Sequence, residues 1–305
     1  MKSILVTGSE GFVGTHLIKK LEESHYEVVP TCYPLLLPKK GDYVPFDILN
    51  LDRSREVLKN HKPDIIFHLA AISSVLKSFL DPRLTYDTNI MGTVNLLEAA
   101  KSLNKKMRFI YVSTCELYGG GENLDETSEI ILKNPYATSK YASELICKNY
   151  LGGNIDCVIL RPFNHTGPGQ VEDFVLPTIA KQIAEIEQGK KPPLIEIGNT
   201  DVKREFMDIH DIVEAYKLAI EKCQKGEIYN ISSNRAYTFA EILEIFKKFS
   251  KEKFEIKVET TRIRKVDSPV LVGNGNKFSN LTGWQPKFEI EKTIEDLLNY
   301  WRAKT

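Results

Sequence analysis

The sequence lacks the features that would place it in a membrane or nucleic-acid-binding class. No stretch of its 305 residues approaches the ~18 consecutive apolar residues that a membrane-spanning helix needs. Neither sign of charge dominates, because 41 Lys and Arg residues balance 41 Asp and Glu residues. We therefore expect a chain that binds neither membranes nor nucleic acids.

Cysteines are few and do not form a recognisable pattern. There are five, with no Cys-x-x-Cys pair: Cys32, Cys115, Cys147, Cys157 and Cys223. This odd number at wide spacing fits neither a disulfide framework nor a zinc site, so no metal is expected. The first residues also lack the long apolar core and cleavage site of a signal peptide. Together these absences predict a protein of the reducing cytoplasm.

The first half of the chain does contain an alternation of β-branched runs and helical patterns. The predicted strands cover residues 3–6, 27–31, 64–69, 108–113 and 156–160. The predicted helices between them cover residues 12–23, 86–103 and 135–150. Strands separated by helices of this length require right-handed crossovers, so the pattern predicts an α/β fold with a Rossmann-type, doubly wound parallel sheet.

Beyond residue 161 the alternation becomes less regular, and turn-forming residues increase. A helix over 211–222 and a strand over 228–231 are expected to return to the sheet, and an amphipathic helix is expected over 290–303. The sequence thus predicts two domains. A dinucleotide-binding domain would comprise residues 1–163 and about 206–233, and a smaller α/β substrate domain would comprise 164–205 and 234–305.

Three glycines lie directly after the first predicted strand and open the first helix, as Gly8-x-x-Gly11-x-x-Gly14. Glycines at this spacing allow a tight turn and the close approach of a pyrophosphate, which the helix N-terminus then binds. The pattern alone is also compatible with an ordinary strand-to-helix turn. Its place at the first strand of a βαβ series favours dinucleotide binding.

A second motif, Tyr136-x-x-x-Lys140, begins the helix that follows the fourth strand. One helical turn separates the two side chains, so both can face one cleft. An adjacent ammonium would lower the pKa of the phenol and prepare it for proton transfer. Such pairs are also common on solvated helices, but Thr114 at the end of the preceding strand favours a catalytic interpretation.

These motifs resemble those of the extended short-chain dehydrogenase/reductase family, which contains nucleotide-sugar epimerases, dehydratases and reductases. The resemblance rests on TGSEGFVG at 7–14, HLAA at 68–71, Asn89-x-x-Gly92-Thr93, STCELYG at 113–119, RPFNHTGPG at 161–169 and TGWQP at 282–286. It extends over essentially the whole chain.

The resemblance implies an NAD(P)-dependent enzyme. It assigns catalysis to Thr114, Tyr136, Lys140 and, in dehydratases, Glu116. It assigns cofactor binding to Gly8, Gly11, Phe12, Val13, Gly14, Asp47, Ile48, Leu69, Ala70, Ala71, Asn89, Tyr136, Lys140 and Pro162. The second strand ends without an acidic residue. Lys39 and Lys40, in the loop that follows, favour NADPH over NADH, although both can also serve only to solvate that loop.

The resemblance also implies a nucleoside-diphosphate sugar as substrate, most similar to the GDP-linked branch of the family. It assigns substrate contacts to Ser73, Thr114, Asn164, Val175, Lys181, Arg204 and Arg264. His165 is expected to be a structural loop residue, and Cys115 is expected to pack in the interior. Helices 86–103 and 135–150 would form a homodimer interface.

The expected reaction is reduction of the C4 ketone of a GDP-linked 4-dehydro-6-deoxy-mannose to the GDP-D-rhamnose product. Three alternatives stay open. Glu116 would suit a 4,6-dehydratase, the same Thr/Tyr/Lys site would suit a 4-epimerase, and a catalytically silent nucleotide-binding scaffold would need none of these groups.

Overall fold

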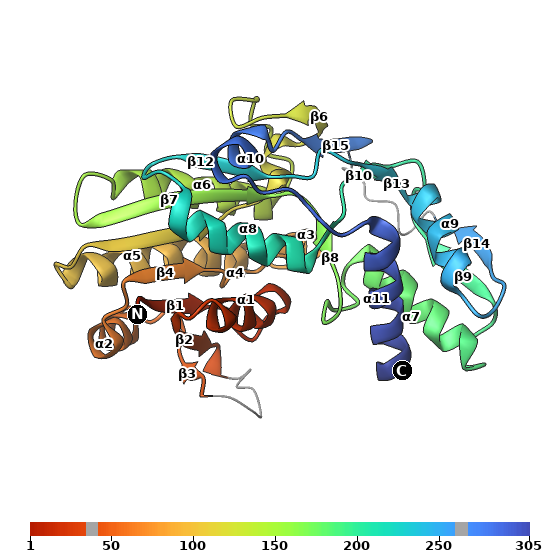
Figure 1. The fold of residues 1–305 in the computed structure, drawn as a ribbon, viewed down its shortest axis with the longest axis horizontal. Coiled ribbons are helices and arrows are strands. Elements are labelled where there is room, and N and C mark those ends of the chain that lie inside the picture. Colours follow the sequence, from red (N-terminus) through yellow and green to blue (C-terminus); the bar gives the residue numbers. More distant parts are fainter. Residues whose placement is uncertain (35–41, 260–267) are drawn as a thin grey trace.

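The computed structural model describes residues 1–34, 42–259 and 268–305. Its centre is a parallel sheet in the order β12-β7-β5-β4-β1-β2-β3 (Figure 1). These strands are β1 (Ser3–Thr7), β2 (Glu27–Cys32), β3 (Val44–Pro45), β4 (Ile65–His68), β5 (Met107–Val112), β7 (Ile155–Pro162) and β12 (Ile228–Ile231). The order reverses between β1 and β4. The predicted fold class, a doubly wound Rossmann-type sheet, is therefore confirmed, including the return of the 228–231 segment.

Helices cover both faces of this sheet because each strand is apolar on both sides. On one face α1 (Phe12–Glu23) and α8 (Ile209–Lys222) pack through Leu17, Leu21 and Tyr216. The other face is covered by α2 (Leu51–His61), α5 (Gly92–Ser102) and α6 (Pro135–Asn149). We call these seven strands and five helices the sheet unit.

The segment predicted as one helix over 86–103 is helical as far as residue 102, but it contains a wider π-helical turn. Its elements are α4 (Pro82–Tyr86), the π-helical turn η2 (Asp87–Met91) and α5, preceded by α3 (Val75–Leu80). The wider turn occurs at Asn89, whose side chain is buried and bonds other segments. Single π-helical turns are rare, and within α-helices they are frequently found at functional sites.

A second hydrophobic core lies beside the sheet and defines what we call the cap unit. It comprises α7 (Val175–Glu187), β9 (Leu194–Ile197), α9 (Phe239–Phe249), β14 (Glu255–Val258) and α11 (Ile290–Lys304). In Figure 1 these elements gather at one end of the molecule, with the C-terminus. Their core is aliphatic and aromatic, and includes Ile183, Phe246 and Trp301.

Shorter elements connect the two units. They are η3 (Cys115–Tyr118), β6 (Gly121–Leu124), β8 (His165–Thr166), β10 (Lys203–Arg204), β11 (Met207–Asp208), β13 (Tyr237–Thr238), β15 (Val270–Gly273) and α10 (Asn276–Thr282). Strands β13, β10, β15 and β6 form one small sheet, and β8 pairs with β11. In the described part of the chain, no helix is both long and apolar enough to cross a bilayer.

Candidate active site

The glycine-rich loop follows β1 and lies against the end of β4. Gly8 has φ +68°, and a Cβ on it would come within 2.9 Å of the Ala70 backbone. A Cβ on Gly14 would overlap the Gly8 carbonyl oxygen. Gly11 precedes α1, whose N-terminus has no side-chain cap. The loop therefore leaves backbone N–H groups at the helix start for a ligand, as a pyrophosphate requires.

This loop lines one end of a cavity of about 1180 Å³ that runs between the two units. The predicted cofactor residues that line the cavity are Gly8, Gly11, Phe12, Val13, Gly14, Asp47, Ile48, Leu69, Ala70, Ala71, Tyr136, Lys140 and Pro162. The glycine cradle and the uncapped helix fit a dinucleotide, so these residues can hold NAD(P). Asn89 does not line the cavity. Its amide bonds both backbone groups of Ile72 and the hydroxyl of Ser139, so it supports the cavity wall from behind.

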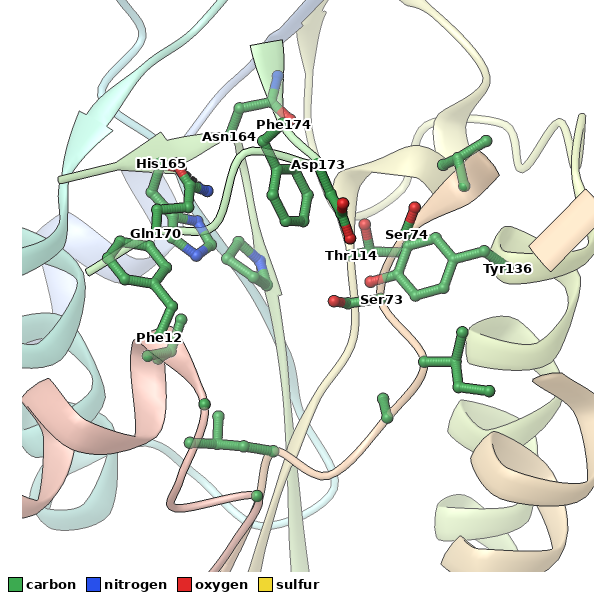
Figure 2. Close-up of a pocket in the computed structure, with 18 of the residues that line it drawn as sticks. Phe12, Ser73, Ser74, Thr114, Tyr136, Asn164, His165, Gln170, Asp173 and Phe174 are labelled. Atoms are coloured by element: carbon green, nitrogen blue, oxygen red, sulfur yellow. Dashed lines mark hydrogen bonds between the residues drawn. The ribbon is translucent and has the colours of Figure 1, made fainter. Parts of the chain in front are cut away.

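Thr114, Tyr136 and Lys140 meet in the middle of the cavity. Tyr136 is the second residue of α6, and Lys140 lies one turn later. Thr114 follows β5 and caps η3, with its hydroxyl accepting a hydrogen bond from the N–H of Glu116 at 3.2 Å. Figure 2 shows the phenol oxygen of Tyr136 pointing toward the oxygens of Thr114 and Ser73. The structure thus brings the three predicted catalytic side chains together.

Burial determines the protonation states of Tyr136 and Lys140. It raises the pKa of Tyr136, while the Thr114 hydroxyl acts in the opposite direction and the charge of Glu116 adds to the rise. Burial also lowers the pKa of Lys140 to about 7. The sequence predicted a lowered phenol pKa, and the direction is reversed because the loss of solvation outweighs the effect of neighbouring groups. Tyr136 is therefore a protonated phenol at neutral pH, the form that donates a proton.

Lys140 is held under the sheet rather than in solvent. Only 4% of it is exposed, and its Nζ lies 4.3 Å from the centroid of the Tyr111 ring. The face of an aromatic ring attracts an ammonium group. This contact fixes the Lys140 side chain beside Tyr136 and limits its motion.

Glu116 also lines the cavity, next to Thr114. Its Oε2 accepts a long hydrogen bond of 3.4 Å from the Asn134 amide, so the carboxylate is only loosely held. Cys115 is buried, and burial raises the pKa of its thiol, which makes it a packing residue. That agrees with the expectation from the sequence.

The predicted substrate residues separate into three groups. Ser73, Thr114, Asn164, Val175 and Arg204 line the cavity. Lys181 does not, and its Nζ instead pairs with Glu172 at 2.8 Å. Arg264 lies outside the described residues. The Arg204 guanidinium donates to the carbonyl oxygens of Lys203 and Ser268, which fixes its position.

Several cavity residues were missed by sequence reasoning. His165, expected to be only structural, lines the cavity, and its ring stacks on Phe12 with centroids 6.2 Å apart. Asp173 and Phe174 lie over the catalytic group in Figure 2, and Asp173 pairs with Lys77 of α3 at 2.6 Å. The one available signal was the apolar periodicity of residues 173–187, the segment that contains α7. The ion pair between Asp173 and Lys77 could not be predicted, because it depends on how the two units pack against each other.

The chain is similar to known proteins over almost its whole length. The family model described as GDP-mannose 4,6 dehydratase matches residues 5–297. GDP-6-deoxy-D-mannose reductase from Pseudomonas aeruginosa is 32% identical, with 99% of this chain and 97% of that protein covered.

Two solved structures show the same fold over the whole chain. The structure of RMD from Pseudomonas aeruginosa complexed with NADPH has a TM-score of 0.89 at 30% identity and covers all of both chains. That of UDP-glucose 4-epimerase from Thermus thermophilus complexed with NAD has a TM-score of 0.86 at 25% identity, covering 99% of this chain and all of the other. The chain belongs to the GDP-mannose 4,6-dehydratase family, within the extended short-chain dehydrogenase/reductases, and is an NAD(P)-dependent nucleotide-sugar enzyme.

Proposed function

We propose that the protein reduces the C4 ketone of GDP-4-dehydro-6-deoxy-D-mannose to give GDP-D-rhamnose. The observation that carries this proposal is the buried Thr114, Tyr136 and Lys140 group in the cavity that starts at the glycine-rich loop. The reductase from Pseudomonas aeruginosa, similar over the full length, supports the choice of sugar. The bound NAD(P)H would supply the hydride.

The residues of the chain have separate tasks in this reaction. The Tyr136 phenol, which its raised pKa keeps protonated at neutral pH, donates its proton to the oxygen that develops negative charge at C4. The Thr114 hydroxyl orients that oxygen. Lys140, when charged, stabilises the phenolate that Tyr136 leaves behind and would bind the nicotinamide ribose. Ser73, Asn164 and Arg204 are proposed to hold the sugar and its diphosphate, for which a guanidinium is well suited.

A dehydratase is the second candidate, because Glu116 faces the same cavity and is loosely held. In that reaction Glu116 would act as the base that removes a proton from the sugar ring. A 4-epimerase would use Thr114, Tyr136 and Lys140 with the cofactor returned to its starting state.

One experiment separates the reductase from the dehydratase. The protein is incubated with GDP-mannose, and separately with its 4-keto-6-deoxy derivative plus NADH or NADPH, while the absorbance of reduced nicotinamide is followed. Stoichiometric oxidation with the keto sugar alone identifies a reductase. A keto product from GDP-mannose without net oxidation identifies a dehydratase, and no reaction with either sugar overturns the proposed reduction of a GDP-linked sugar.

We also propose a homodimer. The helices α4 and η2 pack against α6, and exposed apolar side chains lie on each of them: Leu84 (47% exposed), Met91 (47%) and Leu145 (45%). A second copy would cover these side chains. Light scattering should give twice the chain mass, and Leu145→Glu should reduce it to one. Leu281→Glu, on α10 away from this face, is the matched control.

We further propose a division of the chain into two domains and a cytoplasmic location. Residues 1–163 and 206–233 would bind the cofactor, and 164–205 and 234–305 the nucleotide sugar, in keeping with the separate cap-unit core. The five cysteines are free and buried, which suits a reducing cytoplasm.

A further inference from the structure

Glu10 places a carboxylate at the carboxyl end of β2. The residue lies in the glycine-rich loop, and its Oε1 accepts a hydrogen bond from the backbone N–H of Tyr33 at 2.9 Å. Burial, and then the charge of Glu10, raises the pKa of Cys32, the last residue of β2. Glu10, Cys32 and Tyr33 all line the cavity. The carboxylate therefore belongs to the wall of the cofactor site.

The second carboxylate oxygen of Glu10 lacks a partner. Oε2 is buried and receives no hydrogen bond from any residue that the structure describes. Leaving a buried acceptor unsatisfied destabilises the folded chain, and the cost is greater when the acceptor is charged. Such atoms in native proteins usually have a ligand or a bonding partner. A hydroxyl donor from a molecule in the cavity would satisfy it.

The end of β2 is where this fold distinguishes the two nicotinamide cofactors. An acidic side chain there accepts a hydrogen bond from the adenosine ribose 2′-OH, whereas an arginine accommodates a 2′-phosphate. Here β2 ends in Thr31 and Cys32 and is followed by Tyr33, and none of the three is acidic. Glu10 brings a carboxylate to the same strand end from the adjacent loop.

The basic residues of the cavity lie elsewhere. Among the described residues that line it, Lys140 on α6 and Arg204 on β10 are the only lysine and arginine. Lys39 and Lys40, on which the expectation of NADPH rests, lie outside the described residues. A 2′-phosphate at the end of β2 would thus lie near the negative charge of Glu10. Among the described residues that line the cavity, no lysine or arginine other than Lys140 and Arg204 could compensate for that repulsion.

We propose that Glu10 determines cofactor specificity, selecting NAD(H) over NADP(H) by accepting a hydrogen bond from the ribose 2′-OH and by repelling a 2′-phosphate. This choice departs from the expectation based on Lys39 and Lys40. It also differs from the similar structure from Pseudomonas aeruginosa, which is complexed with NADPH. It concerns only the nucleotide end of the cavity, so it does not depend on which sugar the enzyme uses.

Calorimetric titration of the intact, nucleotide-free protein tests this directly, because it needs no turnover. Wild type should bind NADH about tenfold more tightly than NADPH, equivalent to about 1.4 kcal/mol. Glu10→Gln keeps an acceptor for the Tyr33 N–H but removes the charge. It should tighten NADPH binding, weaken NADH binding and bring the two dissociation constants close to each other.

Glu22→Gln is the matched control. Like Glu10, Glu22 contributes to the raised pKa of Tyr43, but it is exposed and does not line the cavity. Its removal should leave the ratio of dissociation constants unchanged. Tighter NADPH binding by wild type overturns the proposal even if the Glu10 variant fails to fold. An unchanged ratio in Glu10→Gln, or an equal shift in both variants, overturns it as well.

Discussion

The sheet unit and the cap unit differ in what they bury. Beneath the sheet, the His68 ring bonds Thr7 at 2.8 Å and Thr93 at 3.1 Å, and burial together with the charge of Lys140 lowers the pKa of His68 to about 3. A buried Arg161–Glu144 pair at 2.7 Å lies nearby. The cap unit buries fewer polar side chains, Gln182 of α7 and Thr293 of α11, in a core that is otherwise aliphatic and aromatic.

The two kinds of interior constrain the sequence in different ways. Buried polar groups are costly unless each has a partner, so they require fixed backbone positions, and those positions leave motifs in the sequence. An apolar core tolerates many sequences of similar volume and leaves only a periodic pattern. We therefore expect changes beneath the sheet to alter reactivity and protonation, and changes in the cap unit away from the cavity to alter stability.

The largest expected effect comes from Tyr136→Phe. Removing the phenol oxygen deletes the proton donor but keeps the ring in its buried position, so turnover should fall by about 10²- to 10⁴-fold. Binding of NADH should stay within a fewfold of wild type, measured by calorimetry. Tyr141→Phe makes the same change on α6 outside the cavity, and should leave both properties intact. Undiminished turnover in the Tyr136 variant would remove the phenol from the mechanism.

Ionisation of Lys140 should make the stability of the protein depend on pH, which is a smaller effect than the loss of turnover in Tyr136→Phe. Its pKa is about 7 in the folded protein and about 10.4 when unfolded, so between these values the unfolded chain binds more protons. The free energy of unfolding should therefore increase with pH, by about 2 kcal/mol between pH 7 and 9.

The measurement is urea denaturation of the cofactor-free protein at both pH values, alongside Lys140→Met. Methionine has no ionisable group, so the contribution of this site should be absent from the variant. A wild-type protein whose pH dependence matches that of Lys140→Met would mean that Lys140 remains charged beneath the sheet.

Much of the sheet unit could be predicted from the sequence. Helix α1 and the strands β1, β2, β4, β5 and β7 follow the apolar periodicity, whereas the short edge strand β3 and the helix α2 were not predicted. Helix α2 was missed because its composition is polar and only a few of its residues, such as Val57 and Leu58, are buried. The π-helical turn η2 was missed because Asn89, at its centre, bonds Ile72, which lies 17 residues away in the sequence.

Prediction of the site residues from the sequence was limited in the same way. Gly8, Tyr136 and Lys140 were identified because their spacing is fixed by one turn or one loop. Lys181 points away from the cavity, since an exposed lysine pairs with whichever acid the fold places nearby, here Glu172. Glu10 was not singled out either, because its role arises only when the glycine-rich loop meets the end of β2.

The smallest effect is expected in the cap unit, from Thr238→Ala at the start of α9. The Thr238 hydroxyl accepts a hydrogen bond from the Glu241 N–H at 3.1 Å, and the Glu241 carboxylate accepts one from the Thr238 N–H at 2.7 Å. Losing such a cap costs about 1 kcal/mol of unfolding free energy, which Thr238→Ser should largely restore. NADH affinity should not change, because neither residue lines the cavity. A parallel loss of NADH affinity would show that the stability of the cap unit is coupled to the cofactor end of the cavity.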